Sequence, residues 1–216
     1  MGKPIHLTQA HFGWYLDGTE SASTPTQVED ANDTIDCNGA GNVHRHIRIS
    51  LQETNAGTGA STDDYTLYYK KNGAGSYIAV TAERTDVVPY AGTLTDQEAT
   101  TNRSTNGLTD GTGSFVASKC DEANGIVTDW AMTASNFTEM LWSIDFIKSG
   151  VADNDYFDFE VYLNGGIITA YIFQQMHEPP SKRLILRLTT FHNLSRCKQG
   201  LMLGKKIWKI SNAQEK

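Results

Sequence analysis

Residues 43–52 read VHRHIRISLQ, and this stretch decides the fold class. Apolar and polar side chains alternate along it with a period of two, which predicts a half-buried β-strand because successive side chains point to opposite faces. One face carries Val43, Ile47, Ile49 and Leu51 and is interrupted by Arg45. The other face carries His44, His46, Arg48, Ser50 and Gln52, and we expect it to point to solvent.

A β-hairpin is predicted between residues 65 and 80. Residues 65–70 read YTLYYK and residues 77–80 read YIAV, and both runs are rich in aromatic and β-branched side chains. The intervening KNGAGS at 71–76 contains an Asn-Gly pair, which favours the tight turn of a hairpin.

Apolar and polar residues also alternate along residues 140–147 and 157–163. We expect these two strands to form a second hairpin through residues 149–155, and residues 164–166 to turn into a further strand at 167–172. Shorter strands are expected at 12–16 and 114–118. The shared apolar phase predicts an inward-facing core of Ile47, Ile49, Leu51, Leu67, Trp142, Ile144, Phe157, Phe159 and Val161.

Roughly seven or eight strands at these spacings predict an all-β fold, namely an antiparallel β-sandwich of the jelly-roll or Ig-like kind with a C-terminal extension. The strands do not alternate with long amphipathic helices, which argues against an α/β enzyme fold. No run of 18 apolar residues occurs, so we expect no membrane-spanning helix and no membrane partner. The N-terminal residues lack the apolar stretch of a secretion signal.

Charge divides the chain into two predicted parts. Residues 1–176 hold 9 Lys and Arg against 23 Asp and Glu, whereas residues 177–216 hold 9 against 2. We therefore expect an acidic β-sandwich domain at 1–176 and a basic C-terminal arm at 177–216. The arm would bind a partner through Arg187, Lys205, Lys206, Trp208 and Lys209. An acidic protein surface is the favoured partner and nucleic acid the disfavoured one, because the acidic domain repels phosphates.

Two long polar stretches, residues 17–41 and 82–113, separate the predicted strands. Loops of this length are uncommon in a compact domain. One interpretation is disorder or an ordinary surface loop. The other, which we favour, is that these stretches become ordered against a partner in an assembly.

Several polar residues could carry chemistry, but each has a simpler interpretation. His44 and His46 share a strand face without further zinc ligands, so we expect exposed histidines. Calcium could use Asp153, Asn154, Asp155 and Asp158, yet the EF-hand order is missing and such residues also form turns. Carboxylate pairs that could serve glycoside hydrolysis occur at Asp63–Asp64, Asp121–Glu122 and Asp17–Glu20.

We expect those carboxylates to be solvated, because nothing around them in the sequence predicts an apolar setting that would raise a pKa. The chain also lacks a Gly-x-Ser-x-Gly motif and a Walker motif. The prediction is therefore a protein that is not an enzyme and that uses no metal and no cofactor.

The order of several motifs resembles a known family. The motifs are residues 11–20 (HFGWYLDGTE), 43–51, 65–73 (YTLYYKKNG), 96–103 (DQEATTNR), 113–117 (GSFVA), 137–142 (FTEMLW) and 157–163. Over residues 11–172 the chain is similar to a poorly characterised family of β-sandwich virion proteins of tailed bacteriophages. The basic arm departs from the family pattern, which closes with one short strand.

The resemblance implies a structural role in the virion, as a decoration or cement protein of the head that is assembled in the host cytoplasm. Its partners would be the major capsid protein and copies of itself in a homo-oligomer, for which a trimer is one option. The alternative is a carbohydrate-binding or adhesion module of a tail fibre or cell surface, with Tyr68, Tyr77, Trp14 and Tyr90 as candidate aromatics. A glycan-active enzyme ranks third.

Overall fold

The computed structural model describes residues 3–37, 41–103, 105–168 and 173–176. All of them lie in the first of two structural units, Met1–Lys182. The predicted boundary between residues 176 and 177 and the basic arm lie outside the described residues. The described elements are the strands β1 (Leu7–Tyr15), β2 (Val43–Glu53), β3 (Tyr65–Lys71), β4 (Ile78–Ala79), β5 (Val87–Pro89), β6 (Cys120–Asp121), β7 (Ile126–Val127), β8 (Phe137–Phe146), β9 (Tyr156–Leu163), β10 (Gly166–Ile167) and β11 (Phe173–Met176), and the 3-10 turn η1 (Lys148–Gly150).

The first sheet has the order β1-β2-β8-β5, and its neighbouring strands are antiparallel. The short strand β6 adds to β8 in parallel. In the register of the central pair, Ile47 of β2 lies opposite Trp142 of β8. This pairing places the apolar face of both strands on the same side of the sheet, as the alternation in the sequence predicts.

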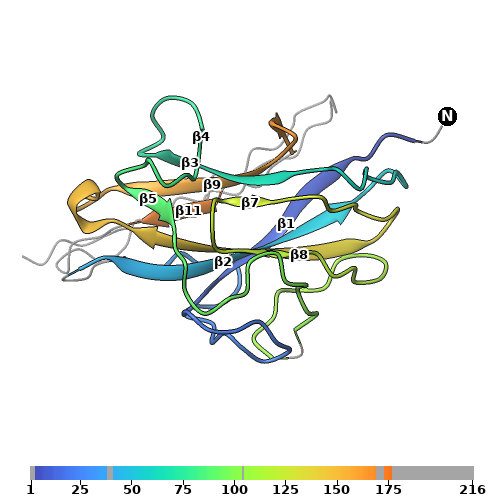
Figure 1. The fold of residues 1–216 in the computed structure, drawn as a ribbon, viewed down its shortest axis with the longest axis horizontal. Helices are drawn as coiled ribbons and strands as arrows, with labels where there is room; N and C mark the ends of the chain where they lie inside the picture. The colour runs from blue at the N-terminus through green and yellow to red at the C-terminus, as the bar shows by residue number, and fades with distance from the viewer. Residues whose placement is uncertain (1–2, 38–40, 104, 169–172, 177–216) are drawn as a thin grey trace, which may run out of the picture. The chain divides into compact units, whose positions relative to one another are not determined.

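The second sheet has the order β10-β9-β3-β4, with β11 also on β9 and β7 also on β3. Its pairs are antiparallel, and Leu67 of β3 lies opposite Val161 of β9. Figure 1 shows the long strands of the two sheets in two layers. The prediction of an all-β antiparallel sandwich is confirmed.

The core lies between the two sheets. All nine residues predicted to face inward are at most 1% exposed. Aromatic rings connect the two layers, since Trp14 of β1 contacts Phe159 of β9 at 5.6 Å and Phe146 of β8 contacts Phe157 of β9 at 5.5 Å between ring centroids. Burial of such large apolar side chains is the main favourable contribution to folding.

The hairpin around Asn72 is confirmed, although its second strand, β4, is short. Asn72 and Gly73 adopt left-handed backbone conformations, with φ of 55° and 62°. The Asn164-Gly165 turn is confirmed as well, since it folds β10 back onto β9. An Asn-Gly pair tolerates positive φ at both central positions, which is why it predicts these turns.

The second predicted hairpin is wrong. Strand β8 pairs with β2 and β5 in the first sheet, whereas β9 pairs with β3 in the second, so residues 147–155 cross between the sheets. Residues 114–118 form an isolated bridge at Phe115 in place of a strand. Residues 87–89, inside a predicted polar loop, form β5 on the edge of the first sheet.

The prediction that the polar face of β2 points to solvent is also wrong. His46, Arg48 and Ser50 are fully buried. The cover comes from two segments that we call the first loop (residues 16–37) and the second loop (residues 90–103); the blue and green loops in Figure 1 follow β1 and β5. The described parts of these polar stretches therefore pack against the chain's own sheet, as the contacts of Arg48 with Glu20 and Thr101 show.

Candidate functional site

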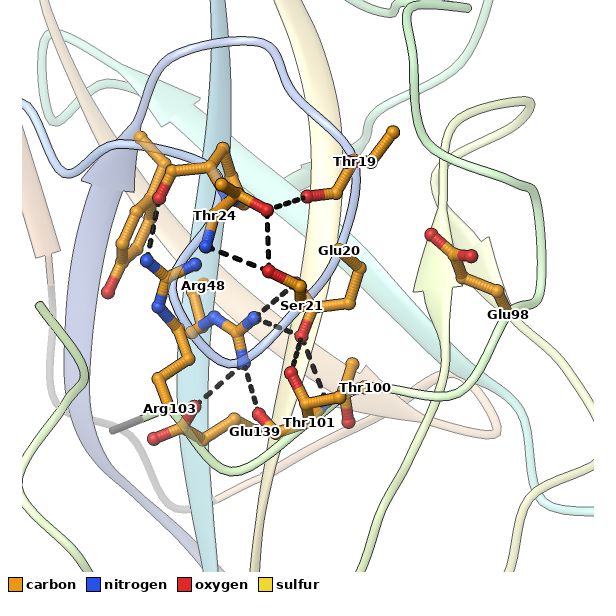
Figure 2. A network of polar contacts seen from close by, with 12 residues as sticks. Thr19, Glu20, Ser21, Thr24, Arg48, Glu98, Thr100, Thr101, Arg103 and Glu139 are labelled. Carbon is orange, nitrogen blue, oxygen red and sulfur yellow. Dashed lines mark hydrogen bonds and ion pairs between the residues drawn. The ribbon is translucent and has the colours of Figure 1, made fainter. Parts of the chain in front are cut away.

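A buried ion network fixes both loops to the outer face of the first sheet (Figure 2). At its centre is Arg48 of β2, whose guanidinium is fully buried. Its Nη1 donates to Glu139 Oε2 at 2.8 Å, and its Nη2 donates to Glu20 Oε1 and Oε2 at 2.6 and 2.5 Å. Arg48 can make these contacts because its planar guanidinium presents several donors in a fixed geometry.

Glu20 connects the two loops to each other as well as to the sheet. It belongs to the first loop, and its side chain is 1% exposed. Besides Arg48, its Oε1 accepts hydrogen bonds from the backbone N–H and the hydroxyl of Thr101 in the second loop, both at 2.8 Å. Arg48 Nη1 also donates to the carbonyl of Thr101 at 3.3 Å. One carboxylate and one guanidinium thus join three segments, and we call Glu20, Arg48, Glu139 and Thr101 the clamp.

Electrostatics within the clamp follow from burial and pairing. Burial disfavours the charged guanidinium of Arg48, but the two glutamates outweigh it and raise its pKa. Burial raises the pKa of Glu139, and Arg48 opposes this shift. The two carboxylates thus depend on Arg48 for their charge balance, which makes the clamp costly to break.

A second arginine, Arg103, also contacts the first loop. Arg103 Nη2 donates to the carbonyl of Pro25 at 2.6 Å, and its guanidinium lies 4.7 Å from the centroid of the Tyr15 ring. The Tyr15 hydroxyl donates to the carbonyl of Asn106 at 2.9 Å. Burial raises the pKa of Tyr15 to about 12, so this hydroxyl keeps its proton.

His46 and His44 lie on the same strand face but have different environments. His46 is fully buried, with Nε2 3.3 Å from Asp17 Oδ1, and burial lowers its pKa to about 4 despite that carboxylate. His44 is half-exposed, lies 3.2 Å from Asp145 and stacks on Tyr90 at 3.9 Å. Each histidine lies beside its own carboxylate. Because His46 is buried, the expectation of two exposed histidines is wrong for His46.

The calcium candidates do not converge on one point. Asp155 accepts hydrogen bonds from the Ala152 N–H and the Asn72 side chain and pairs with Lys71, each at 2.7 Å. Asp158 lies further along β9, opposite Lys70 of β3. Within the described part of the chain, no group of three or more His, Cys, Asp or Glu side chains is placed to hold a metal ion.

The expectation that the remaining carboxylates are solvated is wrong for one member of each of the three pairs. Asp63 is 7% exposed and accepts hydrogen bonds from the Ala60 N–H and the Asn164 side chain. Glu20 is buried in the clamp, as described above. Asp121 is fully buried, and burial raises its pKa to about 6 although the Asn124 and Gly125 N–H groups donate to it. The one feature of the sequence that points to the clamp is Arg48, because it is a charged residue in a strand whose other face is apolar.

The aromatic candidates for saccharide binding occupy three different environments. Trp14 lies in the core and Tyr90 stacks on His44. Tyr68 and Tyr77 lie on the outer face of the second sheet, where Tyr68 stacks on Tyr162 with ring centroids 4.0 Å apart. Tyr162 is not among the candidates named from the sequence. Tyr162 alternates with the inward-facing residues of 157–163, and this alternation places it on the same outer face.

The predicted partner-binding residues Arg187, Lys205, Lys206, Trp208 and Lys209 lie outside the described residues. Among the elements that the structure does describe, none is a helix with the length and apolar character needed to cross a membrane. The chain was also compared with known proteins: no protein-family model, no curated protein and no solved structure matches it.

Proposed function

We propose that this chain is a structural protein of a bacteriophage virion, and that it acts as a decoration or cement protein on the head. In this role it would work by packing against the major capsid protein and against other copies of itself. The proposal rests on the resemblance described above and on two properties of the molecule: preformed loops and separated charge.

The observation that carries the proposal is the clamp. It holds two long polar loops against the sheet through a buried arginine and two buried glutamates. Loops that are already ordered lose less conformational entropy when they pack against another subunit. A sandwich with fixed loops thus suits a protein whose task is to fill a defined position in a shell.

The distribution of charge supports the same role. The acidic part, residues 1–176, and the basic arm, residues 177–216, carry net charges of −14 and +7. Opposite charges favour contacts between the arm of one copy and the body of another or of the shell. An acidic body disfavours nucleic acid as the partner, because its charge repels phosphates.

The proposal is tested by counting copies in purified virions. Quantitative mass spectrometry with isotope-labelled peptides should give hundreds of copies per particle, and labelled antibodies should decorate the head in electron micrographs. A handful of copies confined to the tail tip would replace the head role with that of a tail protein. Complete absence from purified particles would refute a virion role.

A further inference from the structure

The outer face of the second sheet carries a cluster that the clamp does not involve. It consists of Tyr68, Lys70, Tyr77, Asp158, Glu160 and Tyr162, and we call it the tyrosine–carboxylate face. The residues come from the neighbouring strands β3 and β9 and from the segment before β4. In the register, Tyr68 lies opposite Glu160 and Lys70 lies opposite Asp158.

The two carboxylates of this face are buried without complete pairing. Asp158 is 4% exposed and Glu160 is 3% exposed, and Asp158 Oδ1 and Glu160 Oε2 accept no hydrogen bond of normal geometry from the described residues. The nearby Tyr77 hydroxyl opposes the burial that raises the pKa of Glu160, whereas Asp158 has no such neighbour in the described part of the chain. Lys70 attracts both carboxylates, but its Nζ lies over the ring of Tyr77, 4.6 Å from the centroid. One lysine against two acids leaves a net negative charge. A buried carboxylate oxygen without a donor is costly, so the face has capacity for a cation.

The chemistry of the face favours an ammonium or guanidinium group. Three tyrosine rings lie together, since Tyr77 is 6.5 Å from Tyr162 and Tyr162 stacks on Tyr68. Aromatic rings attract cations, and unpaired carboxylate oxygens accept charge-assisted hydrogen bonds from them. A lysine or arginine side chain would satisfy both requirements, whereas a phosphate would be repelled.

We propose that the tyrosine–carboxylate face is the docking site for the basic arm, residues 177–216. Charge complementarity supports this occupant, because the arm holds nine Lys and Arg and carries a net charge of +7. The position of β11 supports it as well. The register places Gln174 opposite Asp158 and Met176 opposite Tyr156, so the arm follows directly after a strand that pairs with β9.

The inference deepens the proposed function by naming the acidic surface that the arm would use. It can fail separately from that function, because copy number in virions tests the virion role and docking is measured on purified protein. A first experiment digests full-length protein with trypsin and follows cleavage after Arg187 and Arg196 by mass spectrometry. The test variant is Asp158→Asn/Glu160→Gln, which keeps the shapes of the side chains and removes their charge.

We expect cleavage of the arm to be at least about tenfold faster in this variant than in the unmodified protein. The matched control is Glu29→Gln/Asp30→Asn, which removes the same charge from two exposed residues of the first loop and should leave the rate unchanged. Added salt should raise the rate of the unmodified protein towards that of the variant, because salt screens ion pairs. Protection that grows with protein concentration would assign the arm to a neighbouring copy, and protection independent of it would assign the arm to the same chain.

A second variant keeps the test valid if the first alters folding. Lys205→Gln/Lys206→Gln/Lys209→Gln changes the arm alone and retains both cleavage sites, and it should also speed cleavage. Equal rates in the unmodified protein and both variants would overturn the proposal. Binding to an array of neutral oligosaccharides that is lost in the Asp158→Asn/Glu160→Gln variant, with unchanged cleavage, would also overturn it in favour of a saccharide site.

Discussion

Replacing Arg48 by methionine tests the energetic role of the clamp. The substitution removes the guanidinium and leaves the carboxylates of Glu20 and Glu139, each 1% exposed, without their shared cation. Removing one partner from a buried ion pair costs about 3–5 kcal/mol, largely because the remaining charge stays desolvated. For a domain of this size each kcal/mol shifts Tm by about 2–4 °C, so we expect a fall of roughly 6–20 °C.

Urea denaturation followed by tryptophan fluorescence measures this change, since Trp14 and Trp142 lie in the core. Lys148→Met is the matched control, because Lys148 is exposed, and its effect should stay within about 0.5 kcal/mol. Adding Glu20→Gln and Glu139→Gln to Arg48→Met should restore part of the loss by removing the unpaired charges. A loss below about 1 kcal/mol in the single variant, or a triple variant that is no more stable than the single one, would refute the reasoning.

Three further substitutions test other parts of the fold. Glu53 accepts hydrogen bonds from four backbone N–H groups, which outweigh burial and lower its pKa to about 2. Because this pKa is lowered, Glu53 should contribute stability above about pH 4.5 that is lost as the pH falls towards 2. Glu53→Gln should therefore lower the free energy of unfolding by about 2–3 kcal/mol at pH 7, measured by denaturation, and flatten that part of the pH profile. Burial lowers the pKa of His46 to about 4, so protonation favours the unfolded state and stability should fall by up to about 3 kcal/mol from pH 6.5 to pH 4; an equally steep profile in His46→Gln would contradict this. Phe159→Ala should cost about 3–5 kcal/mol through a core cavity, whereas Ile167→Ala, at a side chain that is 64% exposed, should change the free energy of unfolding little; similar losses for both would argue against the described core.

The sequence predicts the strands and the core well because alternation is a local property. The period of two in residues 43–52 identifies β2 and its inward side chains, and the Asn-Gly pairs identify two turns. It does not predict which sheet a strand joins. Strands β8 and β9 follow each other in the chain and both alternate, yet they pair with different partners, β2 and β3.

The clamp could not be predicted for a related reason. Alternation shows that Arg48 points away from the core, but it does not show what covers that face. Glu20 and Glu139 are 28 and 91 residues away from Arg48 in the chain. Glu139 meets Arg48 because β8 pairs with β2, a pairing that the alternation does not predict. Glu20 meets Arg48 through the path of the first loop, which has no periodic pattern and whose polar composition predicts solvent exposure.

The shared carboxylate of Glu20 has a consequence for how the molecule opens. Because one side chain accepts hydrogen bonds from Arg48 in the sheet and from Thr101 in the second loop, detachment of either loop breaks the Glu20–Thr101 hydrogen bonds that both loops share. Local opening should therefore be cooperative across segments that lie about eighty residues apart in the chain. Amide hydrogens around Glu20 and Thr101 should therefore exchange with the same opening free energy, as members of one cooperative unit. Long surface loops usually open independently of one another.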